Sequence, residues 1–134
     1  MRNGVLLLLL CVSLLPLTLL AGTDQLQDQL IGTWSGAWIP EGGIRDAMTI
    51  ELKRDESGKL NGRFVTPSSM NFNKMAFNSK TRTLTVEALD KESGKEYTLS
   101  AKVEGNEING SLTVDKQSGK VNLIKWTYIP PVKW

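Results

Sequence analysis

The sequence predicts an all-β protein, an eight-stranded antiparallel up-and-down meander barrel with a short N-terminal helix. Apolar and polar residues alternate strictly, most clearly from Tyr97 to Val103, which is the signature of a half-buried strand. Short Gly-containing connections separate the alternating segments, as in β-hairpins. Beyond residues 24–31, no stretch after residue 22 sustains a helical period. Closing the sheet removes its exposed edges, and a two-sheet β-sandwich is the alternative.

The first 22 residues have the features of a secretory signal peptide. Arg2 gives a positive start, an apolar stretch covers 5–20, and the small residues Ala21 and Gly22 follow. The apolar stretch is short for a bilayer span, which needs about 20 residues, and a retained N-terminal membrane anchor is the alternative. We therefore expect export to a periplasm or the extracellular space. Residues 23–31 are expected to form a short helix or plug, because Asp24 can cap a helical turn.

The barrel domain is expected at 32–129, followed by a C-terminal tail at 130–134. Apolar residues recur with period two in most of the expected strands, for example Met48, Ile50 and Leu52. In the fourth strand the phase slips between Phe72 and Met75, which predicts a bulge near residues 73–74. The expected strands are 33–39, 46–54, 60–66, 70–77, 83–89, 96–104, 107–115 and 121–129.

Hairpin turns are expected at 55–59, 92–95 and 117–120, which share a Ser-Gly-Lys sequence. A tighter turn is expected at 105–106. Gly62 and Gly110 fall on the inward phase of their strands. In a strongly coiled strand, a side chain at such a position would be crowded, and glycine avoids this.

Gly32, Thr33 and Trp34 open the first strand, and Lys125 shares the inward phase of the last. This pattern resembles the calycins, which include lipocalins and fatty-acid-binding proteins, and it is similar to small exported bacterial proteins with a Gly-x-Trp-x-Gly motif. The resemblance implies a closed barrel in which Lys125 packs across the indole of Trp34, with Gly32, Trp34 and Lys125 as structural closure residues. No ligand residues are carried over from these families.

The composition excludes several kinds of functional site. The chain has no His, so it has no Ser-His-Asp triad, Cys-His dyad or His-metal site. A formal net charge of +2 is too small to indicate nucleic-acid binding. Ser68 and Ser69, with Lys74 near in sequence, are the most conspicuous nucleophile candidates, but turn chemistry explains them. We expect a monomer without catalytic activity, metal or cofactor.

A set of apolar residues is expected to face the barrel interior. An eight-stranded barrel is just wide enough to be filled by side chains or to hold one small molecule, so this set either fills the interior or lines a pocket for a hydrophobic ligand. By analogy with lipocalins, the loop 40–46 is the expected entrance. The interior set is Trp38, Met48, Ile50, Leu52, Phe64, Phe72, Met75, Phe77, Leu99 and Leu112.

A second candidate site lies on the outer surface. Trp126 and Tyr128 have the phase opposite to Lys125, and Trp134 ends the tail. An outward aromatic strip suits contact with a protein or an envelope component, unless the tail folds back and covers it. The sequence therefore predicts an exported lipocalin-like barrel that binds a small hydrophobic molecule, with a filled, non-enzymatic accessory or interaction domain as the alternative.

Overall fold

The computed structural model describes residues 26–126, and in this range the protein is all-β apart from one helical turn at 26–28. The chain divides into two compact units after Leu30. In the first unit, the amide of Leu30 donates to the carbonyl oxygen of Gln27 at 3.0 Å. The expected signal peptide at 1–22 and the tail at 130–134 lie outside the described residues.

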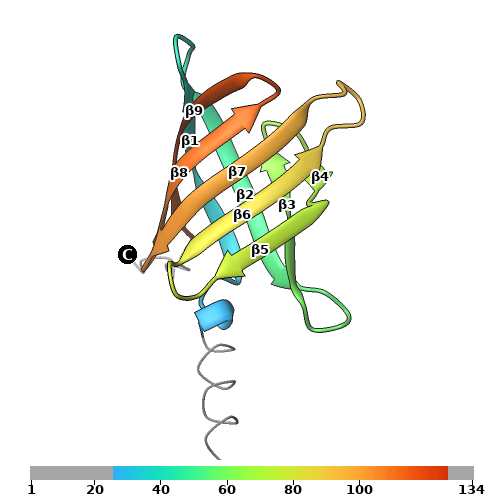
Figure 1. The fold of residues 1–134 in the computed structure, drawn as a ribbon, viewed down its shortest axis with the longest axis vertical. Coiled ribbons are helices and arrows are strands. Elements are labelled where there is room, and N and C mark those ends of the chain that lie inside the picture. Colours follow the sequence, from blue (N-terminus) through green and yellow to red (C-terminus); the bar gives the residue numbers. More distant parts are fainter. Residues whose placement is uncertain (1–25, 127–134) are drawn as a thin grey trace, which may run out of the picture. The chain divides into compact units, whose positions relative to one another are not determined.

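The second unit contains a single antiparallel sheet (Figure 1). Its strands are β1 (Gly32–Pro40), β2 (Asp46–Arg54), β3 (Leu60–Thr66), β4 (Met70–Asn71), β5 (Lys74–Asn78), β6 (Thr83–Leu89), β7 (Glu96–Glu104), β8 (Glu107–Val114) and β9 (Gln117–Lys125).

The strand order in this nine-stranded sheet is β4-β3-β2-β1-β9-β8-β7-β6-β5. Sequence neighbours therefore pair as a meander, and β1 pairs with β9, which brings Trp34 opposite Lys125. The sheet curls into a half-barrel (Figure 1). The all-β prediction is confirmed, and the described residues form one sheet, unlike the two-sheet sandwich that was the alternative.

Two glycines allow the strands to approach closely in the curled sheet. A Cβ atom at Gly62 would lie 2.3 Å from the carbonyl oxygen of Glu51, and one at Gly110 would lie 2.2 Å from that of Ser100. Real Cβ atoms essentially never make contacts this short. The inward-facing glycines of β3 and β8 are therefore needed for the strand packing, as expected.

The segment expected as one strand at 70–77 is divided into β4 and β5. The amide of Phe72 donates to Gly62 O at 3.0 Å, whereas the next amide, of Asn73, donates to Glu87 O at 2.8 Å. Because consecutive amides point to opposite sides, β4 pairs with β3 and β5 pairs with β6. The irregularity was expected near this position, but it separates two strands.

The expected turn at 117–120 is wrong. Those residues belong to β9, and the reversal of direction occurs at 115–116, with Asp115 at a φ of 55°. The other expected turns are present, since Gly58, Gly94 and Gly105 have φ values of 82°, 74° and 58°. Positive φ is the conformation that glycine adopts without steric cost.

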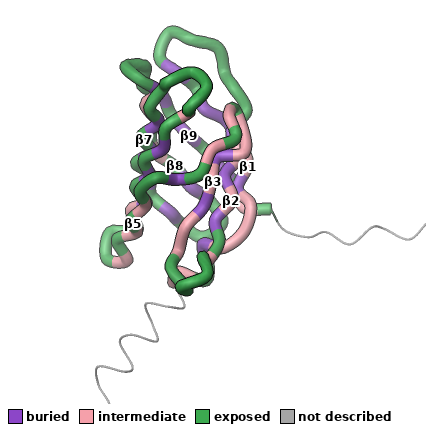
Figure 2. The backbone as a smooth tube through the Cα atoms, turned by 90° about the vertical axis from the view of Figure 1, so that its right-hand side faces the viewer, coloured by how far each residue is buried: buried purple, intermediate pink, exposed green. Residues whose placement is uncertain are grey.

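Buried residues alternate with exposed ones along the strands, as Figure 2 shows. Every residue of the predicted interior set is buried except Met75 and Phe77, which are half-buried because β5 is an edge strand. The Phe64 ring lies 5.2 Å from that of Phe72 and 5.5 Å from that of Tyr97, between ring centroids. These rings form an aromatic cluster within the core.

Candidate ligand-binding site

The meander gathers its connections at two opposite ends of the sheet. One end carries the segments 41–45, 67–69, 90–95 and 115–116, and we call it the loop end. The other end carries the segments 55–59, 79–82 and 105–106 together with Trp34 and Lys125, and we call it the tryptophan end.

At the tryptophan end, the predicted contact between Lys125 and Trp34 is present. The Lys125 Nζ atom lies 5.7 Å from the centroid of the Trp34 ring, which is fully buried. This is within the range of a cation–π interaction. Gly32 has a φ of 142°, and a Cβ atom there would lie 3.0 Å from Lys125 Cε, so glycine leaves room for the lysine stem.

The middle of the sheet is closely packed. Met48, Ile50, Phe64, Leu99 and Leu112 have no exposed surface. Neither the loop-end pocket nor the side cleft, both described below, is lined by Met48, Ile50, Leu52 or Phe64. These interior residues therefore pack against one another as a core.

A pocket of about 750 Å³ opens at the loop end. Trp38, Tyr97, Val114 and Pro67 form its apolar part, and charged residues of both signs surround them. Of these residues, only Trp38 was in the predicted interior set. Tyr97 and Val114 were on the expected inward phase. The alternation of apolar residues therefore predicts that they face inward, but it does not show that they lie at the end of the barrel. The polar residues of the pocket are Asp46, Lys95, Glu96, Asp115, Lys116 and Gln117.

Hydrogen bonds hold the walls of this pocket in place. Trp38 Nε1 donates to Leu112 O at 3.1 Å, which joins β1 to β8. The amide of Glu96 donates to Asp115 Oδ1 at 3.1 Å, and the amide of Asp115 donates to Glu96 O at 2.8 Å. The Asp115 carboxylate thus positions the turn between β8 and β9.

Thr66, the last residue of β3, carries an unusual polar group. Its Oγ1 atom is buried and has no hydrogen-bond partner among the described residues. It immediately precedes Pro67, which lines the pocket. A buried hydroxyl without a partner is costly.

The expected entrance loop lies at the same end. Asp46, its last residue, lines the pocket. The loop is joined to β9, because the amide of Glu41 donates to Ser118 O at 2.9 Å. Gly43 N donates to Pro40 O at 3.1 Å, which makes a tight turn at the start of the loop.

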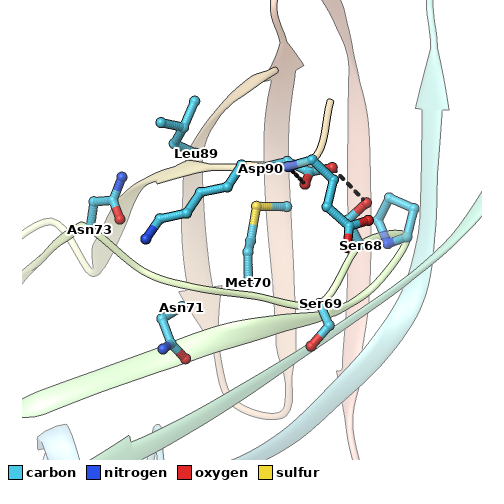
Figure 3. Close-up of a pocket in the computed structure, with 10 residues that line it drawn as sticks. Ser68, Ser69, Met70, Asn71, Asn73, Leu89 and Asp90 are labelled. Carbon is cyan, nitrogen blue, oxygen red and sulfur yellow. Dashed lines mark hydrogen bonds between the residues drawn. The ribbon is translucent and has the colours of Figure 1, made fainter. Parts of the chain in front are cut away.

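A second opening of about 700 Å³, the side cleft, lies between β4 and the end of β6 (Figure 3). Ser68 Oγ donates to Asp90 Oδ2 across it at 3.1 Å. The hydrogen bond from Ser93 Oγ lowers the pKa of Asp90, and the bond from Ser68 Oγ lowers it further. Ser68 is thus bound to a carboxylate rather than to Lys74. The cleft is lined by 67–71, Asn73 and 89–92.

On the outer surface, Ile124 and Trp126 are 53% and 66% exposed. The other members of the predicted aromatic strip, Tyr128 and Trp134, lie outside the described residues.

Within residues 26–126, no group of three or more His, Cys, Asp or Glu side chains is placed to hold a metal ion. The same range contains no helix long and apolar enough to cross a membrane. Comparisons of the chain with protein-family models and with curated proteins find no match. The geometry of the loop end is therefore the basis for a functional proposal.

Proposed function

We propose that this chain is an exported, monomeric, non-enzymatic binding protein that holds a small, partly hydrophobic molecule at the loop end of a calycin-like barrel. The observation that supports it is the pocket of about 750 Å³ in which Trp38 and Tyr97 meet a charged rim. Small-molecule sites commonly have about 300–1,000 Å³, an apolar lining and a few polar groups.

The proposal includes closure of the sheet into a barrel of eight strands. In it, β4 and β5 are two halves of one kinked strand at 70–78, the first paired with β3 and the second with β6. The opposite directions of the Phe72 and Asn73 amides support this closure, because they link the two edges of the sheet. Closure leaves fewer exposed edges for aggregation.

The pocket lining indicates the chemistry of the ligand. Trp38, Tyr97 and Val114 favour an apolar or aromatic portion, whereas Lys95 and Glu96 at the rim favour a polar or zwitterionic portion. The loop end is proposed as the site rather than the barrel interior, because Met48, Ile50 and Phe64 have no exposed surface.

Native mass spectrometry of the protein purified from its own cells tests this function. We expect a bound small molecule in the wild type and its loss in Lys116→Trp, because Lys116 is exposed at the pocket and an indole there would block it. Lys120→Trp is the control, since Lys120 is exposed on β9 and does not line the pocket. A wild-type protein without a bound molecule, or equal retention by both variants, would contradict the proposal.

Thr66→Val tests the unpartnered hydroxyl of Thr66. Because Thr66 Oγ1 has no hydrogen-bond partner among the described residues, we expect the free energy of unfolding to change by less than about 1 kcal/mol, measured by urea denaturation. A loss of about 2 kcal/mol or more would show that the hydroxyl has a structural partner.

The exposed Ile124 and Trp126 favour a second candidate function, an interaction domain that contacts an envelope component. Co-sedimentation with anionic phospholipid vesicles tests one such contact. We expect the wild type to bind with a blue shift of tryptophan fluorescence and Ile124→Ser/Trp126→Ser to remain in solution. Equal sedimentation of the two proteins would argue against this surface.

A further inference from the structure

Two Asn-Gly pairs lie within residues 26–126, and their surroundings differ. Asn61-Gly62 is near the start of β3, and Asn109-Gly110 is in the middle of β8. In such a pair the nitrogen of the next residue can attack the asparagine side chain, and glycine obstructs this approach least because it has no Cβ atom. The two pairs therefore place the same reactive groups in two environments of one protein.

The Asn61 side chain lies against the backbone nitrogen that would attack it. Gly62 N donates to Asn61 Oδ1 at 2.8 Å. Gly62 O accepts from Phe72 N, so the amide of Gly62 faces the same side of β3. Within the described part of the chain, the acceptor on that side is Asn61 Oδ1 and not the carbonyl oxygen of Phe72. The amide nitrogen and the side-chain carbonyl group are thus already in contact.

The side chain of Asn109 is held in a different arrangement. Its Oδ1 atom accepts from Nδ2 of Asn122 on β9. The Asn109 side chain is therefore bonded to a neighbouring strand rather than to the nitrogen of Gly110.

The two asparagines also differ in how many strands hold their backbone. Asn61 pairs with Lys53 on β2, but the pairing of β3 with β4 begins only at Arg63. Asn109 pairs with strands on both sides, β7 and β9. Closing a ring between the side chain and the next nitrogen requires the ψ angle of the asparagine to leave the extended region. This rotation breaks fewer strand pairs at Asn61 than at Asn109, so it needs less local opening.

We propose that Asn61 is a site of spontaneous covalent modification, at which the backbone nitrogen of Gly62 attacks the side-chain amide. Gly62 N gives its proton to hydroxide or water and forms a bond with Asn61 Cγ. The bond from Cγ to Nδ2 breaks, and Nδ2 takes up a proton and leaves as ammonia. The product is a five-membered succinimide. Water then opens this ring: breaking the new bond to Cγ gives aspartate, and breaking the original peptide bond gives isoaspartate.

The modification changes β3 in two ways. Either product adds a negative charge, and isoaspartate also adds one carbon atom to the main chain. The space around Gly62 is filled, since a Cβ atom there would lie 2.3 Å from Glu51 O and 2.9 Å from Phe72 Cε2. We therefore expect the isoaspartate form to be less stable than the asparagine form. Asn61 does not line the loop-end pocket, so the failure of either proposal leaves the other intact.

Peptide mapping by mass spectrometry tests the proposal in the wild-type protein. The protein is incubated at about pH 8 in water enriched in oxygen-18, once folded and once in guanidinium chloride, so that products formed during incubation carry the heavy isotope. We expect Asn61 to react at least about tenfold faster than Asn109 in the folded protein, giving both aspartate and isoaspartate. In guanidinium chloride the two rates should agree within about twofold, because each asparagine precedes a glycine.

Asn61→Gln is the matched variant, because it keeps the amide but lengthens the side chain by one carbon atom and so requires a larger ring. We expect product at position 61 to fall at least about tenfold and product at Asn109 to stay unchanged. Equal rates at Asn61 and Asn109 in the folded wild type would overturn the proposal. So would the absence of product at Asn61 after the denatured chain has reacted completely. Aspartate without isoaspartate would show direct hydrolysis instead of attack by Gly62 N, and it would overturn the proposal as well.

Discussion

Two nearly identical stretches of this chain adopt different structures. Residues 90–95 and 115–120 both have the pattern Asp-Lys-x-Ser-Gly-Lys and differ only in Glu92 versus Gln117. The first forms a loop, with Gly94 at a φ of 74°. The second is a turn at 115–116 followed by β9, in which Gly119 is buried in the sheet.

The first stretch is held by its own aspartate. Asp90 Oδ1 accepts from the amide of Glu92 at 3.1 Å and Oδ2 accepts from Ser93 Oγ at 2.9 Å, while Gly94 N donates to Asp90 O at 2.7 Å. This is the local hydrogen-bonding pattern that Asp, Ser and Gly favour in loops. The loop therefore follows from its own sequence.

The second stretch is held by its neighbours. Gly119 pairs with Pro40 on β1 and with Leu112 on β8, so the stretch lies between two strands. Its aspartate accepts from Glu96 N on β7 instead of from its own loop. Pairing on both sides outweighs the local turn preference, which shows that tertiary context decides between the two structures.

The largest expected difference between the two stretches comes from their glycines. A Cβ atom at Gly119 would lie 2.4 Å from Ile39 O and 2.6 Å from Trp38 Nε1, whereas one at Gly94 would meet nothing within 4 Å. We expect Gly119→Ala to destabilise by about 3 kcal/mol through overpacking and Gly94→Ala by about 1 kcal/mol through its positive φ, in urea unfolding. The reverse order would contradict the account of β9.

The same comparison explains what the sequence could predict about the fold. Alternation identified the strands well wherever one face is buried, as from Tyr97 to Val103, because the side-chain period of a strand is two. It placed the start of the last strand too late, since 117–120 has the local signals of a turn. Only the pairing of Gly119 with Pro40, which depends on residues far apart in sequence, resolves this stretch.

The candidate sites were predicted less completely than the strands. The contact of Lys125 with Trp34 was expected, because phase and the calycin resemblance both pointed to it, and it is present in the structure. The side cleft was not expected. It depends on the directions of the Phe72 and Asn73 amides, and hydrophobic alternation does not report backbone hydrogen-bond directions.

A smaller effect is expected from the two aspartates as a function of pH. Hydrogen bonds, first that from Ser93, lower the pKa of Asp90 in the folded state. A lowered pKa stabilises the fold above the unfolded pKa of about 3.9, and this stabilisation is lost as the pH falls through the folded value. We expect Asp90→Asn to reduce stability at pH 7 and the difference from wild type to shrink below about pH 4.

Urea denaturation at pH 7 and at pH 3 measures this difference. Asp55→Asn in the related loop at 55–59 is a parallel case, because the hydrogen bond from Ser57 also lowers the pKa of Asp55. An Asp90→Asn deficit that is equally large at both pH values would show that the carboxylate charge is not what holds the loop.

The smallest effect is expected from exchanging the one residue that distinguishes the two stretches. Glu92 and Gln117 are both exposed, so the double variant Glu92→Gln/Gln117→Glu should change the free energy of unfolding by less than about 0.5 kcal/mol. The NMR shifts of Gly94 and Gly119 should stay distinct, because pairing with β1 and β8 determines the second structure. If residues 115–120 in the variant instead formed a loop like 90–95, the side chain at 117 rather than the pairing would set the start of β9.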